Sequence, residues 1–525
     1  MRLQGLTCGG SVAGGSVTSG QVCDPADADG SCAAEEEPEE SRKPPHVVFL
    51  SDSFTGHVNP ALPIVAALKA RGCPVSFFVE DTMKDVVEAA GATWFPFKSP
   101  SSSFTGVPKE LDEAGVEEFV PKGTPASRHT GLQHAGVYNA RNLLPALLED
   151  LRAAEPRPAI IVYDPFLAFP LVAAHVLEIP AVGLLTMPGP GAGVGLARLG
   201  VAAESEPWVD EPRKQIKEAY GFDVLQHGIA LNHYSPLRTL VSTIDELFVP
   251  SASVQLERFG GLKNFVCVGA LVDPSVKRVQ HATKDATTGH PDSDALPFDF
   301  IEQEIAKGRK LLYVSLGTVA TGPNLWHAPM AQYVAGNDEH DAAISARPLG
   351  DYTGQEFCQF VWRACIEAVG GDDDFLVILN VGPQPDARDG LPPMPSNFIV
   401  RQTVPQLRVL ERASAFVTHG GANSVHEALS MGVPLAVVPI FGDQPLNADN
   451  VANSAAGVSY RHPLRTLRAS GLRAVLREMA GLGGGSNRYR EGALRLSRKL
   501  EEAGGVRAAA DAILELAPPR PPKIQ

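Results

Sequence analysis

The chain has 525 residues, of which 44% are hydrophobic and 20% are charged, and its formal net charge is −15 at pH 7. This length exceeds what one ordinary hydrophobic core accommodates and favours two domains plus a tail. The acidic balance, without a basic stripe carrying interleaved aromatic residues, argues against a nucleic-acid-binding protein.

Cysteine usage and the length of the apolar runs bear on the compartment. The seven cysteines are scattered and odd in number, without the paired spacing of a disulfide framework or a zinc site. No apolar run reaches the length of a membrane span, and the N-terminus has no basic region followed by an apolar signal core. We therefore expect a cytoplasmic protein with no membrane span and no metal site.

The predicted elements begin after a polar tail. Residues 1–43 are rich in Gly, Ser, Ala and acidic residues, which predicts a disordered acidic N-terminal tail. A helical pattern then starts at Pro60 and stops at Gly72. Apolar runs predict strands at 46–51, 75–79, 159–163 and 181–185. Because strands that alternate with helices pair in parallel, residues 44–272 are predicted to form a doubly wound α/β domain.

A second domain of the same class is predicted further along the chain. Residues 273–297 are polar and are predicted to be an interdomain linker. The alternation of strands and helices restarts over 298–488, and a helix interrupted at Gly504 and Gly505 is predicted over 489–516. The strands of this second domain are predicted at 311–316, 375–380, 414–418 and 435–439.

A small-residue turn follows the strand that ends at Phe416 and Val417. The turn opens a helix, where unpaired backbone N–H groups and the helix dipole favour an anion, and a diphosphate is the predicted occupant. A plain strand-to-helix connection without a ligand is the alternative for such a turn taken alone. The turn consists of His419, Gly420, Gly421, Ala422, Asn423 and Ser424.

The surrounding residues make this segment specific. Residues 404–448 resemble the donor-binding signature of the UDP-dependent glycosyltransferases of family 1, the group that holds plant secondary-product and bacterial macrolide glycosyltransferases. The resemblance implies a GT-B fold of two Rossmann-like domains facing a cleft, with the acceptor bound by the N-terminal domain and the donor by the C-terminal domain. It also implies that the helix at 489–516 crosses back onto the N-terminal domain. The matching positions outside the turn are Gln406, Glu427, Pro434, Asp443, Gln444 and Asn447.

The resemblance also implies a role for each donor-site residue. The turn and the Ser-Leu-Gly-Thr segment at 315–318 would hold the two phosphates, Gln406 and Glu427 the ribose, and Asp443 and Gln444 the sugar hydroxyls. Thr403 and Ala422 replace two tryptophans common in plant members, which leaves UDP and dTDP both open, with UDP preferred. The predicted donor-binding residues are Ser315, Gly317, Thr318, Thr403, Val404, Gln406, His419, Gly420, Gly421, Ala422, Asn423, Ser424, Glu427, Asp443 and Gln444.

A catalytic base is predicted near the N-terminus. The first strand is followed by Gly-His-Val-Asn-Pro, which places His57 in a loop immediately before the predicted helix. The resemblance implies that His57 takes the proton of the acceptor hydroxyl and that Asp164, after the strand at 159–163, orients it. Nearness to a helix N-terminus is expected to keep the imidazole neutral. A polar loop residue and a strand-end turn residue are the structural alternatives for these two positions.

Together these features lead to a functional prediction. We expect an inverting transfer of a hexose, with glucose favoured by Gln444, from a UDP-sugar to a hydroxyl of a small lipophilic acceptor, without cofactor or metal. A nucleotide-sugar epimerase and an inactive nucleotide-sugar-binding module are the alternatives. Acceptor contacts are expected around 99–133 and 187–236. The segment 321–353 is longer than is typical of the family that the sequence resembles. A disordered insert, a lid over the donor and a partner surface are the three alternatives for it.

Overall fold

The computed structural model describes residues 43–98, 128–192, 207–226, 228–229, 232–250, 256–279, 296–330 and 349–518. Several predictions therefore lie outside the described residues in whole or in part. They are the tail apart from Lys43, most of the linker at 273–297, the middle of the segment 321–353, and much of both expected acceptor regions. Both sheets described below belong to one compact unit, Lys43–Gln525.

The first sheet has seven parallel strands in the order β3-β2-β1-β4-β5-β8-β9. Its inner strands are buried along their whole length, as expected for a parallel sheet covered on both faces. A separate two-stranded antiparallel ribbon joins β6 (Gly228–Ile229) to β7 (Asn232–His233). The strands of the sheet are β1 (His46–Leu50), β2 (Val75–Phe78), β3 (Thr93–Phe95), β4 (Pro158–Tyr163), β5 (Ala181–Leu185), β8 (Arg238–Val241) and β9 (Phe265–Cys267).

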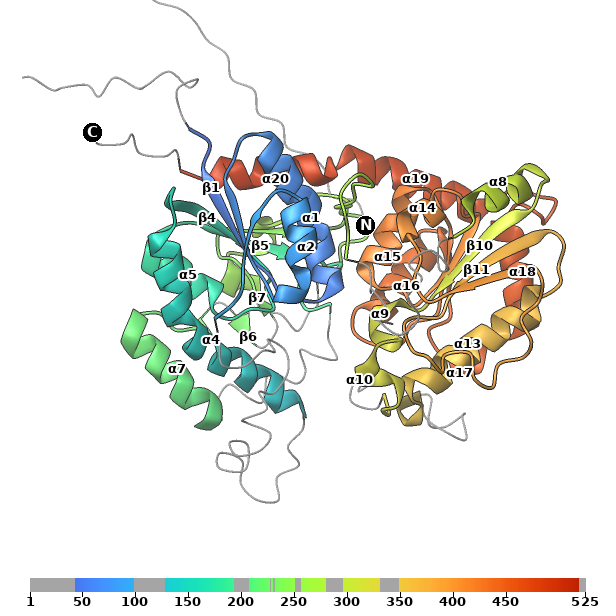
Figure 1. Cartoon of the computed structure of the whole chain (residues 1–525), viewed down its shortest axis with the longest axis horizontal. Coiled ribbons are helices and arrows are strands. Elements are labelled where there is room, and N and C mark those ends of the chain that lie inside the picture. Colours follow the sequence, from blue (N-terminus) through green and yellow to red (C-terminus); the bar gives the residue numbers. More distant parts are fainter. Residues whose placement is uncertain are drawn as a thin grey trace, which may run out of the picture. The chain divides into compact units, whose positions relative to one another are not determined.

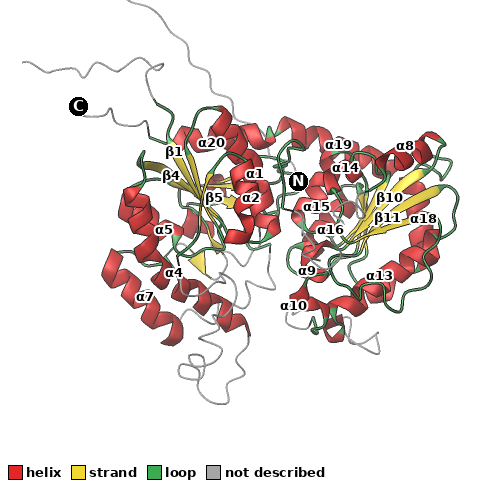
Figure 2. Cartoon of the chain, viewed as in Figure 1, coloured by secondary structure: helices red, strands yellow, loops and turns green. Residues whose placement is uncertain are grey.

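Helices cover both faces of this sheet (Figure 2). One buried cluster joins β1 and β2 to α1 and α2, and another joins β1 and β4 to α4, α5 and α7. The helical segments are α1 (Thr55–Ala70), η2 (Asp81–Met83), α2 (Lys84–Ala89), α4 (Arg128–Ala153), α5 (Pro170–Leu177), α7 (Pro207–Tyr220), η5 (Leu256–Phe259) and η6 (Leu262–Asn264).

The start of α1 corrects the sequence prediction. The helix begins at Thr55 and not at Pro60, so His57 lies in its first turn and not in a preceding loop. The N–H groups of His57 and Val58 both donate to the carbonyl of Phe54, which closes the first turn ahead of the proline. Pro60 removes one backbone donor but fits its fixed φ into the helix.

The second sheet has six parallel strands in the order β12-β11-β10-β13-β14-β15. All eight strands predicted in the two domains are present within two residues of their predicted bounds. The strands of this sheet are β10 (Lys310–Ser315), β11 (Phe375–Asn380), β12 (Phe398–Arg401), β13 (Ala415–Thr418), β14 (Leu435–Val437) and β15 (Gly457–Ser459). Its helical segments are α8 (Phe298–Ala306), α9 (Gly317–Ala320), α10 (Pro323–Trp326), η7 (Leu349–Asp351), α13 (Gly354–Val369), α14 (Gln406–Leu410), α15 (Ala422–Ser430), α16 (Gln444–Asn453), α17 (Pro463–Thr466) and α18 (Ala469–Met479).

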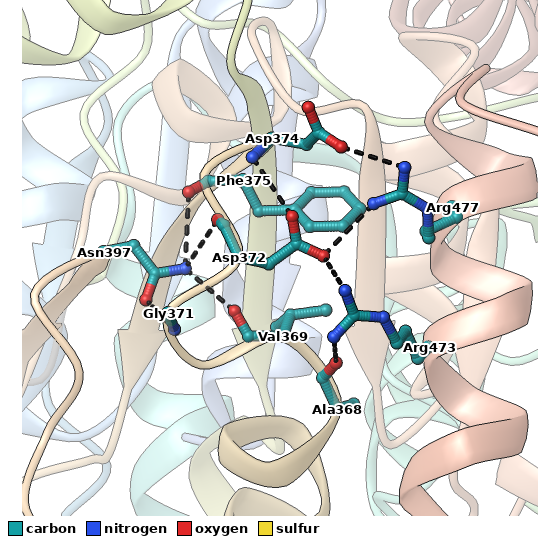
Figure 3. Close-up of polar contacts among 9 residues, drawn as sticks. All are labelled: Ala368, Val369, Gly371, Asp372, Asp374, Phe375, Asn397, Arg473 and Arg477. Atoms are coloured by element: carbon teal, nitrogen blue, oxygen red, sulfur yellow. Dashed lines mark hydrogen bonds and ion pairs between the residues drawn. The ribbon is translucent and has the colours of Figure 1, made fainter.

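A polar network fixes the turn that leads from α13 into β11 (Figure 3). The buried side-chain amide of Asn397 donates to the carbonyls of Val369 at 2.9 Å and Phe375 at 3.3 Å, and its oxygen accepts the Gly371 N–H at 2.9 Å. The carboxylate of Asp372 pairs with two arginines of α18, at 2.6 Å to Arg473 and 3.1 Å to Arg477. Because buried backbone groups need partners, one asparagine stabilises the whole turn.

The last two helices are α19 (Arg488–Glu502) and α20 (Gly505–Leu516), and each packs on helices that cover a different sheet (Figure 1). The first packs on α15 and α18, and the second packs on α1. Ala509, Ala510 and Ile513 of α20 are fully buried within the core of the first sheet. Gly504 separates the two helices with a φ of +87°, a conformation that a side chain disfavours. In the described part of the chain, no helix is both long and apolar enough to cross a membrane.

Candidate active site at the strand ends

The two segments predicted to hold phosphate lie side by side. Strands β10 and β13 are neighbours with Ser315 opposite Thr418, so the residues that follow each strand meet at the same sheet edge. The imidazole of His419 lies between two glycines, since an added Cβ at Gly317 would come within 2.4 Å of it and one at Gly421 within 2.6 Å. Any larger residue at either position would displace the ring.

The environment of His419 determines how it can serve an anion. Burial lowers its pKa to about 4, so the ring is neutral near pH 7. It can therefore offer a hydrogen bond but no positive charge. Charge stabilisation at this edge has to come from the start of α15, where the N-cap residue Gly421 has no side-chain cap. The first backbone bond of that helix runs from Val425 N–H to Gly421 O, so the earlier N–H groups have no partner within the helix, and that of Ala422 donates to the carboxylate of Asp443.

Gly420 gives the turn its shape. Its φ is +86°, and an added Cβ would come within 2.4 Å of a methyl group of Val437. Its carbonyl accepts a hydrogen bond from the amide of Asn447 at 2.8 Å, and its N–H donates to the hydroxyl of Thr418 at 3.3 Å. These contacts hold the turn in the conformation that exposes the start of α15.

The predicted ribose residues form a buried network with a residue that sequence reasoning missed. The amide of Gln406 donates to the carboxylate of Glu427 at 2.7 Å, and the hydroxyl of Tyr313 donates to the oxygen of Gln406 at 3.0 Å. The other carboxylate oxygen of Glu427 is paired with the guanidinium of Arg278. Arg278 lies beyond β9, about 150 residues from Glu427 in the chain, and no local motif marks it.

Asp443 and Gln444, the two residues predicted to bind the sugar, differ in which hydrogen-bonding groups remain free to contact it. Asp443 precedes α16. Burial raises its pKa, hydrogen bonds from the amide of Asn447 and the N–H of Ala422 lower it, and the net pKa is about 6. The side-chain oxygen of Gln444 accepts the N–H groups of Ile440 and Phe441 at 2.8 and 3.1 Å, so only its amide group remains for a sugar. The role of Gln444 is therefore at least partly to shape this turn.

The other predicted donor residues are placed as follows. Val404 and Ala422 are buried. Ser315 is buried at the end of β10, whereas Thr318 is exposed in α9 and Thr403 is partly exposed. Ser424 lies 3.4 Å from the amide of Gln406.

His57 and Asp164 form a hydrogen-bonded pair. They follow the neighbouring strands β1 and β4, in which Leu50 lies opposite Tyr163. The distance from His57 Nδ1 to Asp164 Oδ2 is 2.6 Å, and the side chains are 13% and 5% exposed. Because a carboxylate only accepts, Nδ1 carries the hydrogen, and Nε2 of the neutral ring has the free lone pair that a base needs. Asp164 is itself held by the Phe166 N–H at 2.9 Å.

The expected neutrality of His57 needs correction. Burial lowers its pKa, but the carboxylates of Asp164, Asp52 and Asp443 raise it more, and the net pKa lies above the ordinary value of 6.5. The helix start therefore does not dominate, because the three carboxylates together raise the pKa of the ring. The imidazole of His57 is therefore more basic than an isolated imidazole.

A direct contact joins α1, which carries His57, to α15. The side-chain amide of Asn423 donates to the carbonyl of Gly56 at 2.7 Å. That carbonyl lies four residues before Pro60, which has no N–H to bond it within α1. Nearby, His426 bonds the carbonyl of Ala422 at 2.7 Å and the hydroxyl of Thr243, beyond β8, at 2.8 Å. Asn423, predicted as a phosphate ligand, thus also links the two halves of the site.

Two aromatic rings flank His57. The ring of Phe166 lies 4.5 Å from that of His57 between centroids, and the ring of Phe54 lies 5.6 Å away and is 41% exposed. This surface suits an apolar molecule that presents a hydroxyl to Nε2. Among the described residues, no group of three or more His, Cys, Asp or Glu side chains could hold a metal ion.

Comparisons with known proteins agree with this geometry. The family model described as UDP-glucoronosyl and UDP-glucosyl transferase matches residues 389–502. The uncharacterized UDP-glucosyltransferase YojK of Bacillus subtilis (strain 168) is 26% identical over 475 residues, which cover 90% of this chain and 97% of the relative. The NDP-glycosyltransferase YjiC of the same organism is 24% identical over 469 residues, or 89% and 95% of the two chains.

A solved structure shares the fold over most of the chain. The crystal structure of the glycotransferase of kitacinnamycin superposes with a TM-score of 0.61 at 22% identity and covers 91% of this chain and 100% of its own. Together with the two parallel sheets, this similarity confirms the predicted GT-B fold. The family-model match and these relatives support the predicted resemblance to the family 1 glycosyltransferases.

Proposed function

We propose that the protein transfers a hexose, with glucose as the first candidate, from a UDP-sugar to a hydroxyl of a small lipophilic acceptor. The observation that carries the proposal is the pair of His57 and Asp164 at 2.6 Å, joined through the contact of Asn423 with Gly56 to the helix start that suits a diphosphate. The proposed base and the proposed diphosphate site are thus connected by a direct hydrogen bond between their helices. The names of the curated relatives support a nucleotide-sugar donor.

The proposed reaction is a single inverting displacement. Nε2 of His57 takes the proton of the acceptor hydroxyl while the oxygen attacks the anomeric carbon, and the bond to the nucleotide diphosphate breaks. Asp164 holds the ring and stabilises the imidazolium that forms. The N–H groups at the start of α15 and the neutral ring of His419 receive the negative charge of the leaving group. These groups act without a cofactor or a metal.

Acceptor-dependent release of the nucleotide tests the proposal. Purified protein is incubated with UDP-glucose or dTDP-glucose and a panel of phenols and sterols, and products are identified by mass spectrometry and by the anomeric coupling constant in NMR. We expect a β-glucoside from UDP-glucose, unaffected by a chelator. Activity only with dTDP-glucose, or retention of the α-configuration, would contradict the donor or the mechanism.

Variants separate the enzyme from its alternatives. His57→Ala is expected to abolish transfer while UDP still binds, and His175→Ala, at an exposed ring of α5, is the matched control. Binding of UDP-sugar without turnover in any acceptor would favour a nucleotide-sugar-binding module. A changed sugar configuration in the free nucleotide sugar would favour an epimerase.

A further inference from the structure

A second carboxylate lies beside the base and is not used by the proposed reaction. Asp52 follows β1 and is 2% exposed. One of its oxygens, Oδ1, accepts the Phe54 N–H at 3.2 Å, whereas Oδ2 is buried and has no hydrogen-bond partner among the described residues. A buried carboxylate oxygen without a donor is costly, so such a group generally has a functional or electrostatic reason.

Asp52 contacts the same carboxylate that orients His57. Its backbone N–H lies 3.4 Å from Asp164 Oδ2, the oxygen that also accepts the hydrogen of His57 Nδ1. The adjacency follows from the topology, because the ends of the neighbouring strands β1 and β4 carry the two aspartates. Two carboxylates and one imidazole thus lie in one largely buried cluster.

The charges in this cluster depend on one another. Burial, followed by the carboxylates of Asp164 and Glu80, raises the pKa of Asp52, whereas His57 and the Phe54 N–H lower it, and the net pKa is about 7. In return, the carboxylate of Asp52 raises the pKa of His57, as do those of Asp164 and Asp443. When two groups interact in this way, their protonation steps belong to the pair and not to either residue.

We propose that Asp52 is a positioning residue that sets the basicity of His57 by placing a second negative charge beside its imidazolium. In the step, the O–H bond of the acceptor breaks, an N–H bond forms at Nε2, and the positive charge that develops on the ring is stabilised by Asp164 and Asp52 together. The inference rests on the proposed role of His57 as the base. Below about pH 7, where Asp52 takes up a proton, this support is lost.

The substitution Asp52→Asn removes the negative charge of the side chain and keeps its shape. Asparagine keeps an oxygen that can accept the Phe54 N–H, so a purely structural role would leave the variant like the wild type. Asp52→Ala removes the acceptor as well, and Asp85→Asn, at an exposed carboxylate of α2, is the matched control. In Asp52→Asn we expect the pKa of His57 to fall and the acid limb of the kcat/KM profile to move to lower pH, with a lower plateau.

The pKa of His57 is measured by NMR on the full chain, with the ring signal assigned by its loss in His57→Ala. This readout needs no acceptor, so failure of the proposed transfer reaction and failure of this inference are distinguishable. Unchanged titration of His57 in Asp52→Asn would overturn the inference. If that variant does not fold, the NMR titration of His57 in the wild type tests the inference instead. We expect its signal to titrate in two steps, and a curve for a single proton would overturn the coupling with Asp52.

Discussion

The buried pair of Arg278 and Glu427 leads to a prediction in which stability and nucleotide binding change in opposite directions. The side chain of Glu427 is 3% exposed and that of Arg278 is 21% exposed. Among the described residues, Arg278→Met therefore leaves this buried carboxylate with the amide of Gln406 as its remaining side-chain partner. Removing one member of a buried pair costs about 3–5 kcal/mol. Because water reaches the arginine, we expect a loss of about 3 kcal/mol in the free energy of unfolding.

Nucleotide binding is expected to improve in the same variant. The carboxylate of Glu427 is predicted to accept hydrogen bonds from a ribose diol, and in this structure Arg278 and Gln406 occupy it. Without the guanidinium, UDP no longer has to displace an ion pair. We therefore expect a smaller Kd for UDP in Arg278→Met and a larger gain in unfolding free energy when UDP is added.

The assay is urea unfolding followed by circular dichroism, with and without UDP, alongside calorimetric titration of UDP. Glu427→Gln is the matched partner variant, and the double variant completes a thermodynamic cycle that isolates the pair. Weaker UDP binding in Arg278→Met would refute the reasoning, because it would mean that Arg278 itself contacts the nucleotide. Additive losses in the double variant would show that the two side chains do not interact.

Three further predictions concern the turn, the core and pH. Gly420→Ala is expected to prevent UDP binding, since its Cβ would come within 2.4 Å of Val437 at a φ of +86°; calorimetry that finds wild-type affinity would contradict this. Asn397→Ala is expected to lower the free energy of unfolding by about 2–4 kcal/mol, because buried carbonyls lose their donor, yet to leave KM for the donor unchanged; a changed KM would be the contrary result. His419 has a pKa of about 4 in the folded protein and 6.5 unfolded, so the unfolded state binds more protons between these values and stability rises with pH across this window. The difference corresponds to about 3 kcal/mol, and a His419→Gln variant should show a correspondingly weaker dependence in urea unfolding between pH 4 and 7; equal slopes in the two proteins would count against it.

Local patterns predicted the strands that are buried apolar runs but not the short strands with partly exposed side chains. The strands β1, β4, β10 and β11 are runs of Val, Ile, Leu and Phe that are buried on both faces, and such runs can be read without a partner. Strands such as β3, β12 and β15 have three or four residues each, with partly exposed side chains. They become strands because a neighbour in the sheet offers hydrogen bonds, and this information is not local.

The start of α1 shows a second limit of local reasoning. A proline is favoured at the first position of a helix, and this rule placed the start at Pro60. The helix instead begins five residues earlier, and the Gly56 carbonyl that the proline leaves without a partner in α1 accepts a hydrogen bond from Asn423, 367 residues away. A contact in the tertiary structure thus satisfies what the helix cannot.

The sequence by itself determined the class of fold and the turn from His419 to Ser424, because alternating apolar runs and small-residue turns are local properties of the chain. The choice of His57 and Asp164 came from the resemblance of the sequence to the family 1 glycosyltransferases. Only the tertiary structure decided that Asp52 lies beside this pair and that Arg278 occupies the carboxylate of Glu427. The order of the strands brings together strand ends that are more than a hundred residues apart in the sequence. The pKa of a side chain depends on the charges and the burial that result. The protonation state of the base is therefore a property of the folded protein.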